Sequence, residues 1–225
     1  MKIPENKTLQ ELFEWRFSRT PDSVAHKFLD RETTYKELNN YSNQVANGLI
    51  ELGCKPDTRI AYYGKNSDFF FEVLIGTLKS NTVTVGVNWR LAPPEVSYVL
   101  NDSESEVLFV GADFYPVIDQ ILEDLPKIKK VVAIDGDHEN YQDYISWRNS
   151  QNSANAEIKS SPNDDILQLY TSGTTGHPKG VQLTNENFAA ANESIDGIVP
   201  FEEGSTNLVC MLSLIHISEP TRLRR

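Results

Sequence analysis

The sequence predicts an α/β fold in which mainly parallel β-sheets are flanked by helices. Helix and strand patterns alternate along the chain, which is typical of βαβ units. Short apolar runs rich in β-branched residues, such as Thr82–Val87, indicate strands that are buried on both faces. Two helix starts carry a capping box, at Thr8–Glu11 and at Thr34–Glu37. Together these signals define the fold class.

The expected elements run in order from the first capping box. That box opens a helix with one apolar face, which Pro21 ends. The second box opens a helix that ends at Gly53, before Pro56. The elements expected after it are a strand at Arg59–Tyr63, a helix at Asp68–Lys79, a strand at Thr82–Val87, a helix at Glu95–Leu100, a strand at Val107–Val110, a helix at Pro116–Leu125 and a strand at Val131–Ile134.

A polar stretch then interrupts the alternation and suggests a division of the chain. It is poor in apolar residues and contains Pro162, so we interpret residues 149–164 as a linker or excursion. Residues 1–148 would form a first α/β subdomain, and residues 165–211 would start a second α/β unit.

Composition limits the possible functions. In 225 residues there are 21 lysines and arginines against 32 aspartates and glutamates, a formal charge of −11. Because nucleic-acid binding requires a basic surface, this balance argues against a nucleic-acid partner. Cys54 and Cys210 are far apart and show no metal-ligand spacing. With no signal peptide and no apolar run near the roughly 20 residues of a membrane span, we expect a cytoplasmic protein without a transmembrane segment.

The loop Thr171–Gly180 carries the strongest functional signal. It reads Thr-Ser-Gly-Thr-Thr-Gly-His-Pro-Lys-Gly, between expected strands at Ile166–Tyr170 and Val181–Thr184, after which Asn185 is expected to cap a helix. Glycines let backbone N–H groups approach phosphate oxygens closely. Hydroxyl groups can bind the same oxygens or ligate Mg²⁺, and Lys179 supplies a positive charge. The loop therefore favours a polyphosphate ligand.

The loop does not match the G-x-x-x-x-G-K-[ST] pattern of P-loop nucleotide-binding proteins. No Gly-Lys pair has the required spacing, and a strand rather than a helix follows. Instead, Tyr170–Gly180 resembles the signature phosphate loop of the AMP-forming synthetase superfamily, with His177 at that family's variable position. Val87–Leu91 and its surroundings are similar to the fatty-acyl-CoA synthetase branch, and the resemblance covers residues from about 5 to 211.

The resemblance implies the incomplete N-terminal domain of an adenylate-forming enzyme. In such enzymes a carboxylate attacks the α-phosphate of ATP to give an acyl-adenylate and pyrophosphate, and a thiol, usually that of coenzyme A, then accepts the acyl group. The implied partners are thus a small carboxylic acid, here a fatty acid, with ATP and coenzyme A. The implied phosphate-binding residues are Thr171, Ser172, Gly173, Thr174, Thr175, Gly176 and Lys179, with Thr171 also the implied Mg²⁺ ligand.

The same resemblance implies that no complete catalytic set lies in this sequence. The family's adenine site, acyl pocket and catalytic lysine lie further along the complete enzyme, so we expect this fragment alone to be inactive and poorly stable. Two alternatives stay open: an amino-acid or aryl-acid adenylating enzyme, which differs in its acyl pocket, and a non-catalytic nucleotide-binding module, which lacks the C-terminal domain. Luciferase-like oxygenation has only the shared fold in its favour.

Some conspicuous residues favour ordinary structural roles. We interpret His26, His138 and His177, which have no visible partners, as surface or satisfied core residues. The aromatic run Phe69–Phe71 has helical spacing and is expected to pack in the core.

The last residues, 212–225, form a tail that we expect to be non-native. Leu212–Arg222 resembles the translation of a transposase-type sequencing adapter, and Glu219 and Pro220 would break the strand that Leu208–Met211 begins. The underlying DNA sequence decides this, and codons that differ from the adapter would contradict it. We therefore assign no function to His216.

Overall fold

The computed structural model describes residues 8–171 and 178–196, with backbone alone for 192–196. The expected tail, 212–225, therefore lies outside the described residues. The helices are α1 (Leu9–Arg19), α2 (Tyr35–Glu51), α3 (Asp68–Ser80), α4 (Pro93–Asp102), α5 (Tyr115–Ile121), α6 (Tyr144–Asn149) and α7 (Asn185–Asp196), with short 3₁₀ turns at Ala112–Phe114 and Leu122–Asp124. The strands are β1 (Val24–Phe28), β2 (Arg31–Thr34), β3 (Arg59–Tyr63), β4 (Val83–Val87), β5 (Val107–Gly111), β6 (Lys130–Ile134), β7 (Gln142–Asp143), β8 (Asp165–Thr171) and β9 (Lys179–Thr184).

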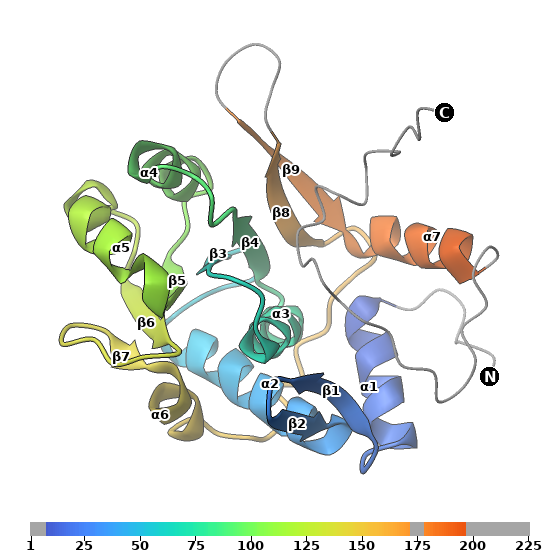
Figure 1. Ribbon diagram of the computed structural model, residues 1–225. Helices are drawn as coiled ribbons and strands as arrows, with labels where there is room; N and C mark the ends of the chain where they lie inside the picture. Colours follow the sequence, from blue (N-terminus) through green and yellow to red (C-terminus); the bar gives the residue numbers. More distant parts are fainter. Residues whose placement is uncertain (1–7, 172–177, 197–225) are drawn as a thin grey trace, which may run out of the picture.

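Seven of these strands form one sheet in the order β7-β6-β5-β3-β4-β8-β9 (Figure 1). All neighbouring pairs are parallel except β8 and β9, which are antiparallel. The predicted mainly parallel sheet is thus confirmed. The expected strand at Arg59–Tyr63 has the observed bounds of β3, and the other predicted strands of this sheet differ from the observed ones by a residue or two at their ends.

Helices cover both faces of the sheet, as predicted (Figure 1). On one face, alternate strand residues such as Ala61 and Val110 pack against α4 and α5. On the other, the intervening residues such as Ile60 and Phe109 pack against α2, α3 and α6. Successive side chains of a strand point to opposite faces of the sheet. A sheet that is buried on both faces therefore needs apolar residues at consecutive strand positions, as seen here.

Capping boxes fix two of the helices where the sequence placed them. Thr8 and Glu11 exchange both hydrogen bonds at the start of α1, and Thr34 and Glu37 do the same at the start of α2. The aromatic run in α3 packs as expected: Phe69 is buried and joins the core beneath α2 and α6.

Two features are additional to the predicted elements. The first is an antiparallel hairpin, β1–β2, beside α2 and α3. The second is the pair β7 and α6, which extends the sheet edge and covers it with the buried Trp147. Both elements lie within residues 1–148 apart from the last residue of α6.

The polar stretch after α6 crosses the outside of α2 and α1 in extended form. The side-chain amide of Asn47 donates to the carbonyl oxygens of Asn152 and Ala154, and that of Gln10 donates to the carbonyl oxygen of Ile158. The stretch leads to β8, which pairs with β4 in the same sheet. The division into units at 149–164 remains a prediction, although β8 and β9 extend the first sheet instead of starting a separate one.

Asn185 does not cap α7, contrary to the prediction. Thr184 takes that role, because its hydroxyl oxygen accepts from the backbone N–H of Asn187 at 3.3 Å. The buried Asn185 side chain instead accepts from the backbone N–H of Leu9 and donates to the carbonyl oxygen of Ser161, both at 2.9 Å. It thereby joins the start of α1 to α7, which lie side by side (Figure 1).

Candidate phosphate-binding hairpin

The predicted phosphate loop joins the two antiparallel strands β8 and β9, as the sequence indicated. Thr171 is the last residue of β8, and Lys179 is the first residue of β9. Five of the predicted phosphate-binding residues, Ser172, Gly173, Thr174, Thr175 and Gly176, lie outside the described residues, as does His177. The structure thus places the two ends of the loop.

The hairpin brings two of the predicted site residues together. Thr171 is paired with Lys179, and Tyr170 is paired with Gly180. Directly paired residues of antiparallel strands project their side chains on the same side of the sheet. The predicted Mg²⁺ ligand and the predicted phosphate-binding lysine are therefore neighbours, and both are exposed at the loop end of the hairpin.

The part of β8 that precedes the loop is buried and paired within the sheet. β8 pairs with β4 from Thr84↔Leu167 to Gly86↔Leu169. The side chains of Ile166 and Leu167 are buried with Leu78 of α3. The loop thus leaves the sheet at its carboxyl edge, from a strand that the core holds in place.

Tyr170 and Gln168 lie across Gly180. A Cβ atom on Gly180 would come within 2.6 Å of Gln168 Nε2 and 3.1 Å of the Tyr170 ring. A side chain at this position would therefore force Gln168 or Tyr170 to shift, because these two side chains of β8 occupy the space that it would need. Gln168 Nε2 also donates to the Tyr170 hydroxyl at 3.0 Å.

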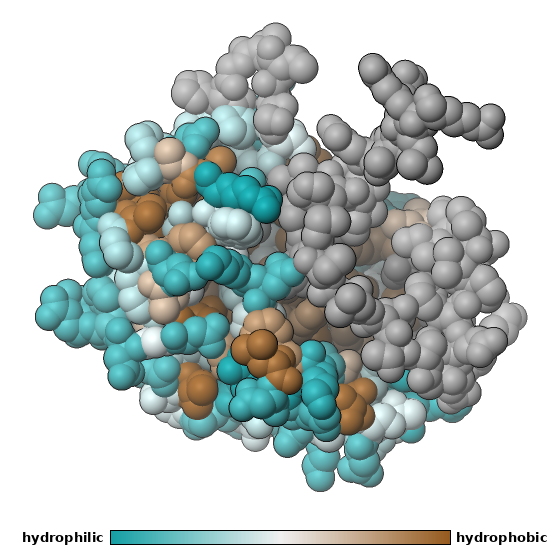
Figure 2. All heavy atoms as spheres, viewed as in Figure 1, coloured by the Kyte–Doolittle hydropathy of each residue, from teal (hydrophilic) through white to brown (hydrophobic). Residues whose placement is uncertain are grey.

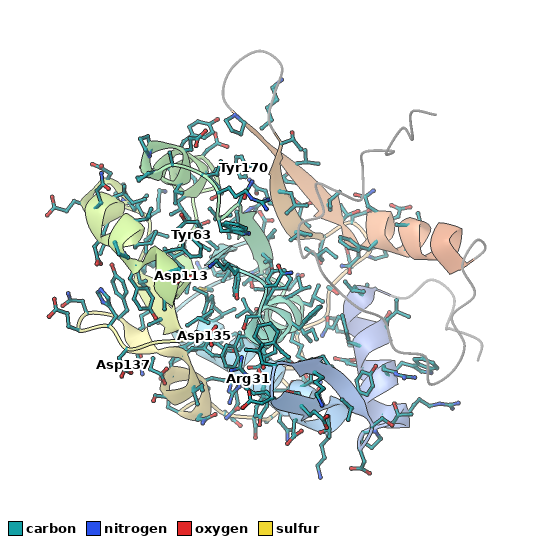
Figure 3. The ribbon with its side chains drawn as sticks, viewed as in Figure 1. Arg31, Tyr63, Asp113, Asp135, Asp137 and Tyr170 are labelled. Atoms are coloured by element: carbon teal, nitrogen blue, oxygen red, sulfur yellow. The ribbon has the colours of Figure 1, made fainter. Side chains whose placement is uncertain are left out.

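Residues of α4 contact both ends of the loop, which the sequence did not reveal. The Tyr170 hydroxyl donates to Asp102 Oδ2 at 2.7 Å, and the Tyr98 hydroxyl lies 3.2 Å from the carbonyl oxygen of Pro178. Figure 3 shows Tyr170 between α4 and the hairpin. Burial, and then the nearby Asp102 carboxylate, raise the pKa of the Tyr170 hydroxyl, so it remains a neutral donor at physiological pH.

A second polar cluster lies at the carboxyl edge of the sheet, over β3 and β6 (Figure 3). Arg31 donates to both carboxylate oxygens of the buried Asp68, at 2.8 and 2.6 Å, and lies 3.9 Å from Asp135. Burial raises the pKa of Asp135, and Arg31 opposes that rise. Among the described residues, no group of three or more His, Cys, Asp and Glu side chains is placed to hold a metal ion. Arg31 joins the two carboxylates in an ion-pair network.

One of the histidines has partners that the sequence did not reveal. His138 Nε2 lies 3.2 Å from Asp119 Oδ2, its Nδ1 accepts from the backbone N–H of Asn140 at 3.2 Å, and its ring stacks on Tyr141. His26 stacks on Phe71, and burial lowers its pKa. His138 therefore has partners, whereas the buried Nε2 of His26 has no hydrogen-bond partner among the described residues, so His26 is packed in the fold but is not a satisfied residue as the sequence interpretation expected.

Comparison with known proteins defines the class. A family model described as "AMP-binding enzyme" matches residues 13–222. The chain therefore belongs to the AMP-binding enzyme family. The matched range includes Leu212–Arg222, whose expected adapter origin stays a prediction.

Named relatives agree on the family and differ in what they act on. The fatty acid–[acyl-carrier-protein] ligase ScoC of Streptomyces coeruleorubidus is 36% identical over 201 residues, 87% of this chain and 37% of the relative. A long-chain-fatty-acid–CoA ligase of Mycobacterium tuberculosis is 36% identical over 73% of this chain and 32% of its own length. Bacitracin synthase 2 of Bacillus licheniformis is 32% identical over 91% of this chain and 7% of the relative.

Solved structures confirm the fold. The anthranilate CoA ligase AuaEII, in complex with anthranoyl-AMP, superimposes with a TM-score of 0.80 at 29% identity, covering 86% of this chain and 38% of that one. A fatty acyl CoA synthetase of Mycobacterium tuberculosis superimposes with a TM-score of 0.77 at 28% identity, over the same shares of the two chains. The chain thus spans about a third of the length of these ligases.

Proposed function

We propose that the complete protein carrying this chain activates a carboxylic acid with ATP, forming an acyl-adenylate and pyrophosphate, and then transfers the acyl group to a thiol. The observation that carries the proposal is the hairpin loop Thr171–Gly180, whose residue types suit a triphosphate and whose ends sit at the carboxyl edge of the sheet. Ligands of open α/β sheets bind at that edge. Membership of the AMP-binding enzyme family supports the same chemistry.

In this proposal the chain binds pyrophosphate, the leaving group of the first step. Lys179 neutralises charge on the β- and γ-phosphates, and the loop residues from Thr171 to Gly176 donate hydrogen bonds to them. Pyrophosphate leaves as a highly charged group, so charge neutralisation and positioning dominate over covalent catalysis by the protein. The loop thereby favours attack of the carboxylate at the α-phosphate.

Thr171 is suited to supply one of the ligands of Mg²⁺. It offers one hydroxyl oxygen at an exposed strand end. Mg²⁺ prefers oxygen ligands and keeps several waters, with substrate phosphates completing its shell. Among the described residues near the hairpin, Thr171 would thus supply one ligand to an ion brought mainly by ATP. The ion would neutralise phosphate charge.

We propose a fatty acid as substrate and coenzyme A as acceptor, supported by the fatty-acyl-CoA ligases among the relatives. Other relatives favour two further possibilities. One is named as a ligase that uses an acyl carrier protein, and another as an anthranilate CoA ligase. An aryl or amino acid as substrate, and a carrier-protein thiol as acceptor, are therefore the alternatives to test directly.

A product assay on the complete protein separates these possibilities. The protein is incubated with Mg-ATP and hydroxylamine, which traps activated acyl groups, and with fatty, aryl or amino acids in turn. We expect hydroxamate and stoichiometric pyrophosphate with fatty acids. Repeating the reaction with coenzyme A or with phosphopantetheinylated carrier protein instead of hydroxylamine identifies the acceptor. Absence of pyrophosphate release with every acid would overturn the proposed activity and favour the non-catalytic module.

A further inference from the structure

Asp102, the last residue of α4, lies behind the base of the phosphate loop. Its Oδ2 accepts from the Tyr170 hydroxyl at 2.7 Å. Its Oδ1 lies 3.4 Å from the Tyr98 hydroxyl, which in turn lies 3.2 Å from the carbonyl oxygen of Pro178. Tyr170 immediately precedes Thr171, and Pro178 immediately precedes Lys179. One carboxylate and one tyrosine of α4 thus reach the chain at both ends of the loop.

The hydrogen bonds on the β8 side all run in one direction. Arg59 Nε donates to Gln168 Oε1 at 3.2 Å, and Gln168 Nε2 donates to the Tyr170 hydroxyl at 3.0 Å. Because arginine can only donate, this order fixes the orientation of the Gln168 amide. The single hydrogen of Tyr170 is then left for Asp102. Hydrogen bonds that are linked in one direction and end on a carboxylate polarise and strengthen one another. The side chains in this row therefore resist rearrangement.

On the β9 side, Tyr98 couples the loop to the same carboxylate. Its hydroxyl has one hydrogen and two acceptors within reach, Pro178 O and Asp102 Oδ1, so it can donate to only one at a time. Its ring also meets the Tyr170 ring edge-on, with centroids 6.5 Å apart. The two tyrosines therefore form one packed unit, with Asp102 beneath their hydroxyls.

We propose that Asp102 is a positioning residue for triphosphate binding, which acts by fixing Tyr170 and, through Tyr98, Pro178, so that Thr171 and Lys179 keep their spacing. This inference rests on the proposed function and goes beyond it, because Asp102 itself touches no substrate. A carboxylate suits the role because one of its oxygens accepts from the Tyr170 hydroxyl, and the Tyr170 ring so held packs against the ring of Tyr98, whose hydroxyl can donate to Pro178 O. Asparagine can still accept from Tyr170 with its oxygen, whereas alanine leaves the buried Tyr170 hydroxyl without its acceptor.

The test uses the complete protein and compares Asp102→Ala with Asp102→Asn. ATP affinity is measured by titration calorimetry, and KM and kcat by acid-dependent ATP–pyrophosphate exchange. We expect Asp102→Ala to weaken ATP binding and raise the KM for ATP by about tenfold, the effect of one lost charge-assisted contact. The KM for the acid should stay unchanged, and Asp102→Asn should recover ATP binding to within about threefold. The matched control is Glu123→Gln, at an exposed carboxylate after α5, which should behave as wild type.

Two results would overturn the role of Asp102. One is wild-type ATP affinity in Asp102→Ala, and the other is an equal loss of ATP and acid binding together with a lowered melting temperature, which would mark a structural residue only. If Asp102→Ala fails to fold, Tyr98→Phe carries the test, because it removes the hydroxyl that reaches Pro178 and Asp102 while it keeps the ring, and it should raise the KM for ATP by a few-fold. An unchanged KM there would contradict the proposal.

The same experiment distinguishes this inference from the proposed function. A wild-type protein that binds ATP but shows no exchange with any acid would overturn the proposed function. The Asp102 variants would still be judged by their ATP affinity. A wild-type protein that binds no ATP would overturn both.

Discussion

Gly180 is a residue of the candidate loop at which neighbouring side chains disfavour any substitution. Replacing it with alanine would place a Cβ atom 2.6 Å from Gln168 Nε2 and 3.1 Å from the Tyr170 ring. Both side chains belong to the row of hydrogen bonds that ends at Asp102, so neither can move away without breaking that row.

We therefore predict that Gly180→Ala lowers the free energy of unfolding of the complete protein by about 1–3 kcal/mol, the usual cost of overpacking. Urea unfolding followed by tryptophan fluorescence measures it. Gly111→Ala in β5 is the matched control, because its new Cβ would meet its nearest atom at an ordinary 3.4 Å. Equal unfolding free energies for the two variants would show that the space beside Gly180 is not filled as described.

Lys79 is a buried amine with neutral partners. Its Nζ donates to Asn39 Oδ1 at 2.8 Å and to Asn43 Oδ1 at 2.7 Å, and it lies over the Phe17 ring. Burial lowers its pKa from 10.5 to about 8, and the Glu14 carboxylate of α1 partly opposes this shift. Between these two pH values the unfolded chain binds a proton at Lys79 that the folded chain releases, so stability rises with pH there.

The predicted pH dependence is a difference between wild type and Lys79→Met. The unfolding free energy of wild type relative to Lys79→Met should rise from about pH 8 to about pH 10.5 and be flat below about pH 8. Comparing each variant with wild type cancels the other titrating groups. The control is Lys129→Met, because a hydrogen bond to Glu106 raises the pKa of Lys129 and gives no rise in this window. A flat difference for Lys79→Met would show that Lys79 is not buried in this way.

At the scale of elements, a buried ion pair joins α3 to α6. Arg148 Nη1 donates to Glu72 Oε2 at 2.6 Å, and the Tyr144 hydroxyl donates to the same oxygen at 2.7 Å. The guanidinium also stacks over the Tyr41 ring of α2, 3.8 Å from its centroid. Since Glu72 and Arg148 are both almost fully buried, each is tolerated only because the other is present.

We predict strong non-additivity at this pair. Arg148→Met alone should destabilise by about 3–5 kcal/mol, because it leaves the Glu72 carboxylate buried without a counter-charge. The double variant Glu72→Leu with Arg148→Met should lose much less. As a control, breaking the exposed pair with Lys27→Ala should cost less than about 1 kcal/mol. A double-mutant cycle on unfolding free energies checks this, and additive losses would contradict it.

The elements that the sequence predicted are those fixed by local signals. Capping boxes at Thr8 and Thr34, and the β-branched run of β4, need only neighbouring residues to be recognised. The β1–β2 hairpin was missed because its turn has Leu29 at φ 55° where a glycine or asparagine would have signalled it, and β1 lacks a strict alternation. The burial of Arg148 and the role of Asn185 depend on partners distant in the chain, which no local pattern reveals.

The candidate site, too, was predictable from the sequence only in part. The glycines, hydroxyls and lysine of the loop were recognisable because a polyphosphate requires those residue types close together. Asp102 and Tyr98 lie in the family-like segment that follows Val87–Leu91, but their contact with the loop arises only when β8 inserts beside β4 and faces α4. The order of the strands in the sheet brings these residues together, and no local sequence pattern reveals such contacts.

At the scale of the whole molecule, the hairpin forms one of the two edges of the sheet, opposite β7. β9 pairs only with β8 among the described strands, and its residues from Lys179 to Gln182 are exposed. Figure 2 shows apolar side chains reaching the viewed surface in separate places among hydrophilic ones. No helix among the described residues is long and apolar enough to cross a membrane. An exposed strand edge of this kind is available for pairing with another segment.

We predict that the isolated chain of residues 1–211 lacks acid-dependent pyrophosphate exchange, whereas the complete protein has it. The physical reason is that the chain carries the proposed phosphate-binding loop but spans only about a third of the length of related ligases. Size-exclusion chromatography and exchange assays on both proteins provide the measurement. A monomeric fragment that unfolds cooperatively and forms acyl-adenylate would contradict this prediction.

The most direct test of the central claim is acid-dependent ATP–pyrophosphate exchange by the complete protein with Lys179→Ala. A lost charge-assisted contact of about 1.5–3 kcal/mol predicts exchange efficiency about ten- to a hundredfold below wild type, with the melting temperature unchanged. Lys36→Ala, at an exposed lysine of α2, is the matched control and should exchange at the wild-type rate. Exchange at the wild-type rate in Lys179→Ala would contradict the claim that this hairpin binds the triphosphate of ATP.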